Sequence, residues 1–189
     1  MKETRRLLCV FILVLMVCCN THDTKTIVKN WLGKEMLSDF TLANDSLANK
    51  IKGKFCVVSY VDSLGCVSCK LGLRKWSAFS AYVDSLIGKH VPIIFIVSES
   101  AQRDMRFSLK ADHYTPDMVV VDYKDSLNKV YGFPENNELQ TFLLNKEHKI
   151  VVVGNPIHNE KVLELYVRTI VKSNGVSSEF IEKRKNTIR

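Results

Sequence analysis

Two cysteines, Cys66 and Cys69, have the residue type and spacing best suited to chemistry in this chain. They lie in the stretch VDSLGCVSCKLGLRKW, residues 61–76, after an apolar run and before an amphipathic one. A pair at this spacing can be a redox-active dithiol, part of a metal site or a structural staple. A c-type haem is disfavoured because it needs a histidine directly after the second cysteine, where this chain has Lys70.

A metal site made by the protein alone is also disfavoured. Zinc would need two further ligands beside the cysteine pair. The histidines stand singly along the chain, at His22, His90, His113, His148 and His158. We therefore expect neither a metal nor another cofactor.

The spacing of apolar residues predicts the elements that position the pair. A continuous apolar run from Phe55 to Val61 predicts a buried strand that leads toward the cysteines. Apolar residues then recur every three or four positions, at Leu73, Trp76, Phe79, Val83 and Leu86. This spacing predicts an amphipathic helix whose first turn holds the cysteine pair. At such a helix start, unpaired N–H groups and the helix dipole favour a thiolate on Cys66, while Cys69 lies one turn further in.

The rest of the chain alternates between strand-like and helix-like segments. Helices are expected near 101–111, 126–131 and 162–170. Strands are expected at 38–45, 91–97 and 117–122, and in a hairpin whose tight turn runs from Asn145 to His148. This alternation, closed by a hairpin and a helix, predicts an α/β fold around a mixed central sheet.

The first residues read as a bacterial export signal. Arg5 and Arg6 precede an apolar run from Leu7 to Val17, which is shorter than the roughly 20 residues that span a bilayer. The run ends at Cys18-Cys19, which resembles the lipobox of bacterial lipoproteins. We expect Cys19 to carry the lipid. Cys18 is the alternative position, and two unmodified cysteines in a signal core are the alternative interpretation.

These features divide the chain into four parts. We expect a lipoprotein-type signal peptide at 1–18, a linker at 19–34, one domain at 35–172 and a basic tail at 173–189. Removing the signal takes away three basic residues and one acidic residue, so the formal net charge falls from +7 to +5. No aromatic residues interleave with a basic stripe, so nucleic acid is not an expected partner.

The order of these elements resembles the thioredoxin fold, and in particular the TlpA-type thiol-disulfide oxidoreductases of the bacterial envelope. The resemblance covers residues 35–171 and is carried by DFTLANDS, GKFCVVSYVDSLGCVSCK and TFLLNKEHKIVVVGNP. The strand and helix at 117–131 resemble the insertion that distinguishes this group from thioredoxin. The resemblance implies a mixed central sheet flanked by helices, with an N-terminal strand extension and an inserted strand-helix unit.

The resemblance also implies a function. Cys66 is expected to attack a disulfide as the nucleophile, and Cys69 to resolve the mixed disulfide. The expected partners are thiols or disulfides of exported proteins and a membrane electron donor or acceptor. The expected location is the bacterial cell envelope, on the periplasmic side of a membrane, through the lipid on Cys19.

The sequence departs from the family pattern at two places. The family has a cis-proline before the penultimate strand, and the matching position here is Leu139. A cis bond without proline costs about 3 kcal/mol, so we expect a trans peptide there, unless Pro134 reaches the site through an irregular loop. The family's buried acid is also missing, because Tyr60 and Gly72 occupy the matching positions. Asp62 is a possible substitute as proton acceptor.

Two other functions stay open. One is a non-catalytic binding lipoprotein of thioredoxin-like fold, in which the Cys66–Cys69 disulfide is structural. The other is a peroxiredoxin-like thiol peroxidase, because Ser63 stands three residues before Cys66, where peroxiredoxins have threonine or serine. Those enzymes also have a proline four residues before that threonine or serine, and this chain has Ser59 there. Cys56, inside the apolar run, is expected to be a buried small hydrophobe.

Overall fold

The structure, a computed structural model, describes residues 24–37, 45–64 and 67–175. The chain forms two compact units, residues 1–32 and 33–189. In the first unit, residues 24–31 are helical. Among the described helices, none has the length and apolar character needed to span a bilayer. The predicted signal segment and most of the basic tail lie outside the described residues.

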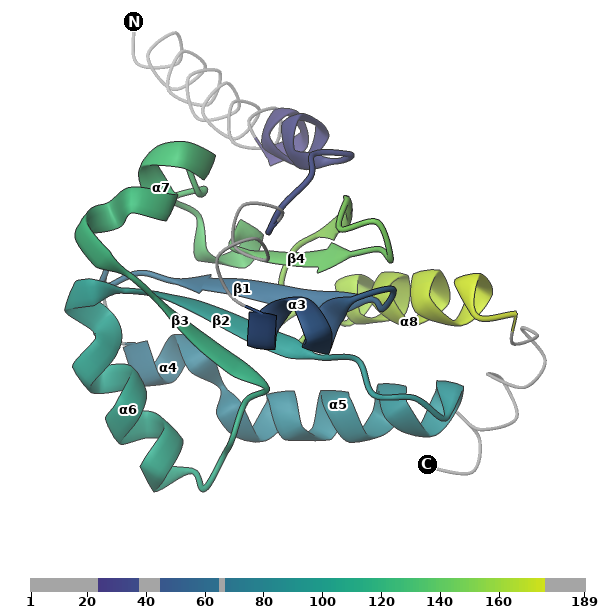
Figure 1. The fold of residues 1–189 in the computed structure, drawn as a ribbon, viewed down its shortest axis with the longest axis horizontal. Helices are drawn as coiled ribbons and strands as arrows, with labels where there is room; N and C mark the ends of the chain where they lie inside the picture. The colour runs from purple at the N-terminus through teal and green to yellow at the C-terminus, as the bar shows by residue number, and fades with distance from the viewer. Residues whose placement is uncertain (1–23, 38–44, 65–66, 176–189) are drawn as a thin grey trace, which may run out of the picture. The chain divides into compact units, whose positions relative to one another are not determined.

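A five-stranded mixed sheet forms the centre of the second unit (Figure 1). Its strand order is β3-β2-β1-β4-β5. The strands are β1 (Cys56–Val61), β2 (Ile93–Ser98), β3 (Met118–Asp122), β4 (Thr141–Leu144) and β5 (Ile150–Val153). The first three run parallel, and β4 and β5 are antiparallel to their neighbours. The predicted α/β fold with a mixed central sheet is confirmed.

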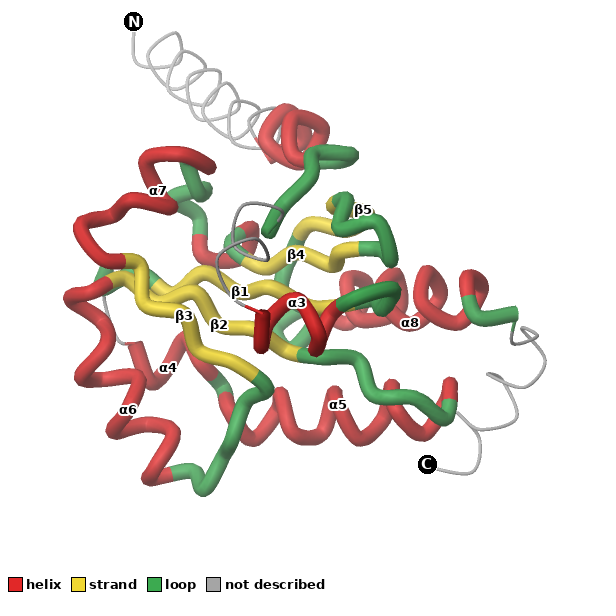
Figure 2. Tube along the Cα trace, in the orientation of Figure 1, coloured by secondary structure: helices red, strands yellow, loops and turns green. Residues whose placement is uncertain are grey.

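Helices lie on both sides of this sheet, as the helix and strand colours of Figure 2 show. The α-helices of the second unit are α3 (Asp45–Ile51), α4 (Val67–Leu71), α5 (Leu73–Ile87), α6 (Gln102–Ala111), α7 (Ser126–Tyr131) and α8 (Glu160–Ser173). Three short 3-10 helices connect them: η1 (Glu99–Ala101), η2 (Tyr123–Asp125) and η3 (Asn137–Leu139).

The main hydrophobic core lies between one face of the sheet and helices α4, α5, α6 and α8. Trp76 of α5, at 1% exposure, meets Phe79 and Phe95 edge-on, with ring centroids 5.5 and 5.9 Å apart. Tyr166 of α8 joins the same cluster and packs against Phe79. Each large side chain buried this way contributes about 2–3 kcal/mol, so the core fixes α5 and α8 against β1.

The other face of the sheet carries a second aromatic group. Tyr60 of β1 stacks on Phe133 with centroids 4.2 Å apart and planes at 12°. Phe133 also contacts Phe142 of β4 and Tyr131 at the end of α7. Because successive strand residues point to opposite faces, Val61 enters the main core while its neighbour Tyr60 enters this group.

The helix predicted after the cysteines is broken into two, which corrects the sequence prediction. Gly72 separates α4 from α5 and has a positive φ of 50°. The positive φ favours glycine, and a Cβ added there would also lie 2.9 Å from Ile157 Cδ1, so that side chain would have to shift. The apolar spacing continued through Gly72 and could not show this break.

Two other expectations concern strands. Most of the strand expected at 38–45 lies outside the described residues, and Asp45 is instead the first residue of α3. The hairpin turn is confirmed: Asn145 N donates to Lys149 O at 2.9 Å, and Asn145 Oδ1 accepts from Lys149 N at 2.8 Å.

Candidate active site

The cysteine pair follows the central strand of the sheet. β1 pairs with β2 on one side and with β4 on the other, and it ends at Val61. Cys69 is the third residue of α4. All of Cys66 and the side chain of Cys69 lie outside the described residues. The described backbone therefore brings Cys69 close to the carboxyl end of β1.

Asp62 is held at the start of the turn between β1 and α4. Its Oδ1 accepts a hydrogen bond of 3.0 Å from the N–H of Leu64. Its Oδ2 accepts one of 2.8 Å from the side-chain Nε2 of Gln140. These two hydrogen bonds fix the orientation of the Asp62 carboxylate. Asp62 stands four residues before Cys66 in the sequence.

Gln140 connects three segments around this turn. Its Nε2 also donates to the carbonyl of Pro134 at 2.8 Å, and its own carbonyl accepts from Tyr60 N at 2.8 Å. Only 4% of Gln140 is exposed. Sequence analysis did not single it out. The available signal was a polar residue directly before the apolar strand TFLL, at a position that proves to be buried.

Leu139, the residue at the cis-proline position, is buried and ends η3. Its N–H donates to Asn136 O at 2.9 Å. All peptide bonds of the described residues are trans, including the one before Leu139. The carbonyl of Pro134 accepts from Gln140 Nε2, and the peptide bond before Pro134 is trans as well. One residue, Gln140, separates Leu139 from β4.

A cavity of about 460 Å³ opens beside α4. Its lining comes from β1 and β2, from α4 and α5, from η3 with the residue after it, and from the loop after β5: Ser59, Tyr60, Val61, Leu71, Trp76, Phe95, Asn137, Glu138, Gln140, Asn155 and His158. Leu71 is the last residue of α4, two positions after Cys69. A ligand in this cavity would therefore lie next to the helix that carries the motif.

His158 is a second residue that sequence analysis did not place in the site. It is exposed and lines the cavity. A Cβ added at Gly72 would lie 3.8 Å from its Cε1, so the ring covers the junction of α4 and α5. Nothing in the local sequence around His158 indicates this position, because the contact joins segments 86 residues apart.

Tyr60, at the position of the family's buried acid, cannot serve as a base near neutral pH. Burial raises its pKa to about 12, with further contributions from the negative charges of Asp122, Asp125 and Asp62. The phenol therefore stays protonated near neutral pH, and its hydroxyl can donate or accept a hydrogen bond but does not take up a proton. Asp62, by contrast, has its carboxylate at the turn.

Cys56 is chemically silent, as predicted. It is fully buried in β1, and burial raises the pKa of its thiol to about 12. A thiol needs its thiolate form to react, so Cys56 does not compete with the cysteine pair. Within the described residues, no three His, Cys, Asp or Glu side chains are grouped closely enough to hold a metal ion.

Comparison with known proteins supports the fold. No protein-family model matches the sequence, and no curated protein matches it. Two solved structures are similar at a TM-score of 0.50 and cover 66% of this chain and 84% of their own. They are a protein from Chlorobium tepidum, described as the thiol:disulfide interchange protein DsbE, at 16% identity, and yeast Sco1, at 19%. StoA from Bacillus subtilis is 25% identical over 55% of this chain and 75% of its own, with a TM-score of 0.40. The fold is thioredoxin-like, as the sequence predicted.

Proposed function

We propose that this chain is a thiol-disulfide oxidoreductase of the bacterial envelope that works through Cys66 and Cys69. One observation carries the proposal: in a thioredoxin-like fold, the CxxC segment follows the buried central strand β1 and runs into α4, next to an open cavity. This is where a dithiol can meet a disulfide of another protein while the sheet holds it in place. The name of the Chlorobium protein, a thiol:disulfide interchange protein, agrees with this chemistry.

The exchange proceeds in two balanced steps. The Cys66 thiolate attacks one sulfur of the partner's disulfide, forming a mixed disulfide and releasing the partner's other sulfur as a thiolate. Cys69, after losing its proton, attacks the Cys66 sulfur, which frees the partner's second thiol and leaves the Cys66–Cys69 disulfide. A membrane electron donor then restores the dithiol. The same steps in reverse order, with a membrane electron acceptor to reoxidise the pair, oxidise the partner.

Two features support these roles. Cys66 precedes α4, whose first N–H groups have no partner within the helix and favour an anion. Asp62 is aimed by Leu64 and Gln140 at the start of the same turn, and we assign it as the proton acceptor for the pair. The carboxylate takes the thiol proton directly or through one water.

The anchor is part of the proposal. Cys19 carries the lipid, which holds the domain on the periplasmic side of a membrane, where exported proteins supply thiols and disulfides. Cys19→Ala should leave the mature chain unacylated, and fractionation with mass spectrometry would show it. A wild-type chain that is soluble and unmodified would exclude the anchor without affecting the redox chemistry.

The trans peptide before Leu139 favours a second candidate. Without the family's cis-proline, the groove beside the pair differs from that of the family, and a structural disulfide in a binding lipoprotein would tolerate that change. The two candidates differ in whether a variant that lacks one cysteine of the pair forms mixed disulfides with other proteins.

Trapping of mixed disulfides separates the candidates. A Cys69→Ala variant removes the resolving thiol, so it should accumulate mixed disulfides with envelope proteins through Cys66. A matched Cys66→Ala variant should trap far fewer, and Cys56→Ala should change nothing. If both single variants trap nothing and lose only stability, the disulfide is structural.

A further inference from the structure

A second cavity, of about 330 Å³, lies where β1 and β2 begin. Its lining comes from four separate segments: Gly53, Lys54, Phe55, Ile87, Lys89, His90, Val91, Lys146 and Asn174. β1 is six residues long, so this end of the sheet is roughly 20 Å from the end that leads to the cysteine pair. The cavity therefore plays no part in the proposed redox chemistry.

Three lysines give the lining of this cavity positive charge. Lys54 precedes β1, Lys89 follows α5, and Lys146 lies in the turn between β4 and β5, so the fold gathers them from distant parts of the sequence. The lining contains no aspartate or glutamate. Among the described residues, none of the three ammonium groups is paired with a carboxylate.

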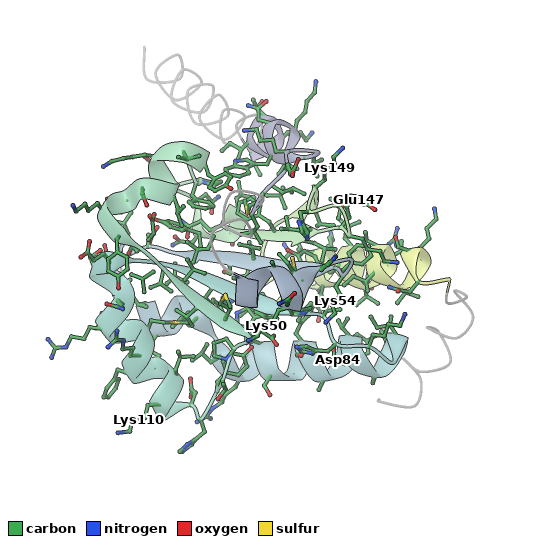
Figure 3. The ribbon with its side chains drawn as sticks, in the orientation of Figure 1. Lys50, Lys54, Asp84, Lys110, Glu147 and Lys149 are labelled. Atoms are coloured by element: carbon green, nitrogen blue, oxygen red, sulfur yellow. The ribbon has the colours of Figure 1, made fainter. Side chains whose placement is uncertain are left out.

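Two aspartates, Asp84 and Asp117, contact His90, which belongs to the cavity lining. Its Nδ1 lies 2.6 Å from Asp84 Oδ2, and its Nε2 lies 2.8 Å from Asp117 Oδ1. The other oxygens of these two carboxylates accept the N–H groups of Val91 at 3.1 Å and Ile93 at 2.8 Å. A histidine can donate from both ring nitrogens only as the imidazolium. Asp84 and Asp117 are thus hydrogen-bonded to His90, Val91 and Ile93, and among the described residues neither forms an ion pair with a lysine of the cavity (Figure 3 labels Lys54 and Asp84).

The floor of the cavity is apolar. Phe55 and Val91 are 6% and 2% exposed, and Ile87 is half-buried. An anion between the lysines would be partly shielded from water, which strengthens its attraction to the ammonium groups. Asn174 also belongs to the cavity lining.

From this cavity and its three lysines, which have no carboxylate partner in the part of the chain that the structure describes, we propose that the end of the sheet opposite the cysteine pair binds a phosphate-bearing anion. Ammonium groups are strong partners of phosphate oxygens because both are charged and compact. The phosphate belongs either to a soluble molecule or to the headgroup of an anionic phospholipid. The proposal does not depend on the redox function.

A matched pair of charge variants of the full-length chain tests the proposal. The cavity variant is Lys54→Ala/Lys89→Ala/Lys146→Ala. The control variant is Lys75→Ala/Lys110→Ala/Lys161→Ala, which removes the same charge from exposed lysines outside the cavity lining. Lys110 is labelled in Figure 3, at the end of α6. Thermal unfolding of both variants checks that each remains folded.

Two probes separate the sources of phosphate. Inorganic phosphate is titrated while NMR shifts are followed, and binding to phosphatidylglycerol vesicles is compared with binding to phosphatidylcholine vesicles by sedimentation. A lysine near an anionic surface contributes roughly fivefold in affinity, so the cavity variant should lose about 100-fold and the control much less. Loss with vesicles alone, or with both probes, assigns a headgroup. Loss with phosphate alone assigns a soluble ligand. If the two variants bind each probe equally, the proposal is overturned.

Discussion

The side-chain amide of Gln140 donates to the carboxylate of Asp62 at 2.8 Å, across 78 residues of sequence. The same nitrogen donates to the carbonyl of Pro134. This one buried side chain joins the end of β1, the loop before η3 and the start of β4, and it holds Asp62 at the turn that leads to Cys66.

Gln140→Leu should therefore destabilise the domain. The substitution keeps the apolar volume but leaves the Pro134 carbonyl and one oxygen of Asp62 without their donor, which costs about 1–3 kcal/mol in the free energy of unfolding. Urea denaturation of the wild type and the variant measures the difference. Gln140→Glu is the matched control for shape: it should be destabilised at pH 7, where its carboxylate faces Asp62, and recover as the pH falls. An unchanged stability of Gln140→Leu would show that the bridge is not needed.

Gly72→Ala should be more damaging than Gly88→Ala. Both glycines have positive φ, 50° and 65°, so both alanines carry a backbone strain of about 1 kcal/mol. Only at Gly72 would the new Cβ meet another side chain, Ile157 Cδ1 at 2.9 Å, whereas nothing lies within 4 Å at Gly88. Because Ile157 Cδ1 is the end of a flexible side chain that can shift, we expect Gly72→Ala to lose only about 0.5–1.5 kcal/mol more, the cost of an off-rotamer side chain, measured by thermal unfolding. Equal losses would mean that Ile157 moves aside without cost.

His90 should make the stability of the domain depend on pH. Partial burial alone would lower its pKa, but hydrogen bonds to Asp84 and Asp117 and the charges of these carboxylates outweigh burial and raise the pKa above its usual 6.5. The charged form is thus favoured in the folded state. Its contribution is fully present below pH 6.5 and is lost as the pH rises through the raised folded value.

The matched variant for this effect is His90→Gln, which cannot change charge. Denaturation between pH 5.5 and pH 9 should show the difference in stability between wild type and variant shrinking toward high pH. A difference that is constant over this range, or grows with pH, would contradict the assigned imidazolium.

The cysteines should react in a fixed order with an alkylating agent at pH 7. After reduction, Cys66 should be modified first, because helix-start N–H groups favour its thiolate. Cys56, with a pKa of about 12 and no exposure, should react only when the domain unfolds. Mass spectrometry of timed samples gives the order. Modification of Cys56 or Cys69 ahead of Cys66 would reverse the proposed roles.

The sequence predicted the elements whose signals are local. Phe55 to Val61 was expected as a strand and β1 spans Cys56–Val61, because a strand buried on both faces is continuously apolar. The turn at Asn145 was likewise predicted from residues that bond within it.

Features that join distant segments were missed. The close approach of Gly72 to Ile157 joins two distant segments, and Gln140 matters because β1 and β4 are neighbours in the sheet. The spacing of nearby residues predicts neither of these two relationships. The sequence identified the cysteine pair, but the residues around it depend on strand order.

The reduction potential of the Cys66–Cys69 couple tests the central claim most directly. It can be measured by equilibrating the protein with glutathione buffers and quantifying the oxidised fraction. An exchanging pair should have a potential between about −270 and about −120 mV, the range of catalytic CxxC proteins. A potential below about −300 mV would mark a bond that resists reduction, and it would contradict the oxidoreductase in favour of a structural disulfide.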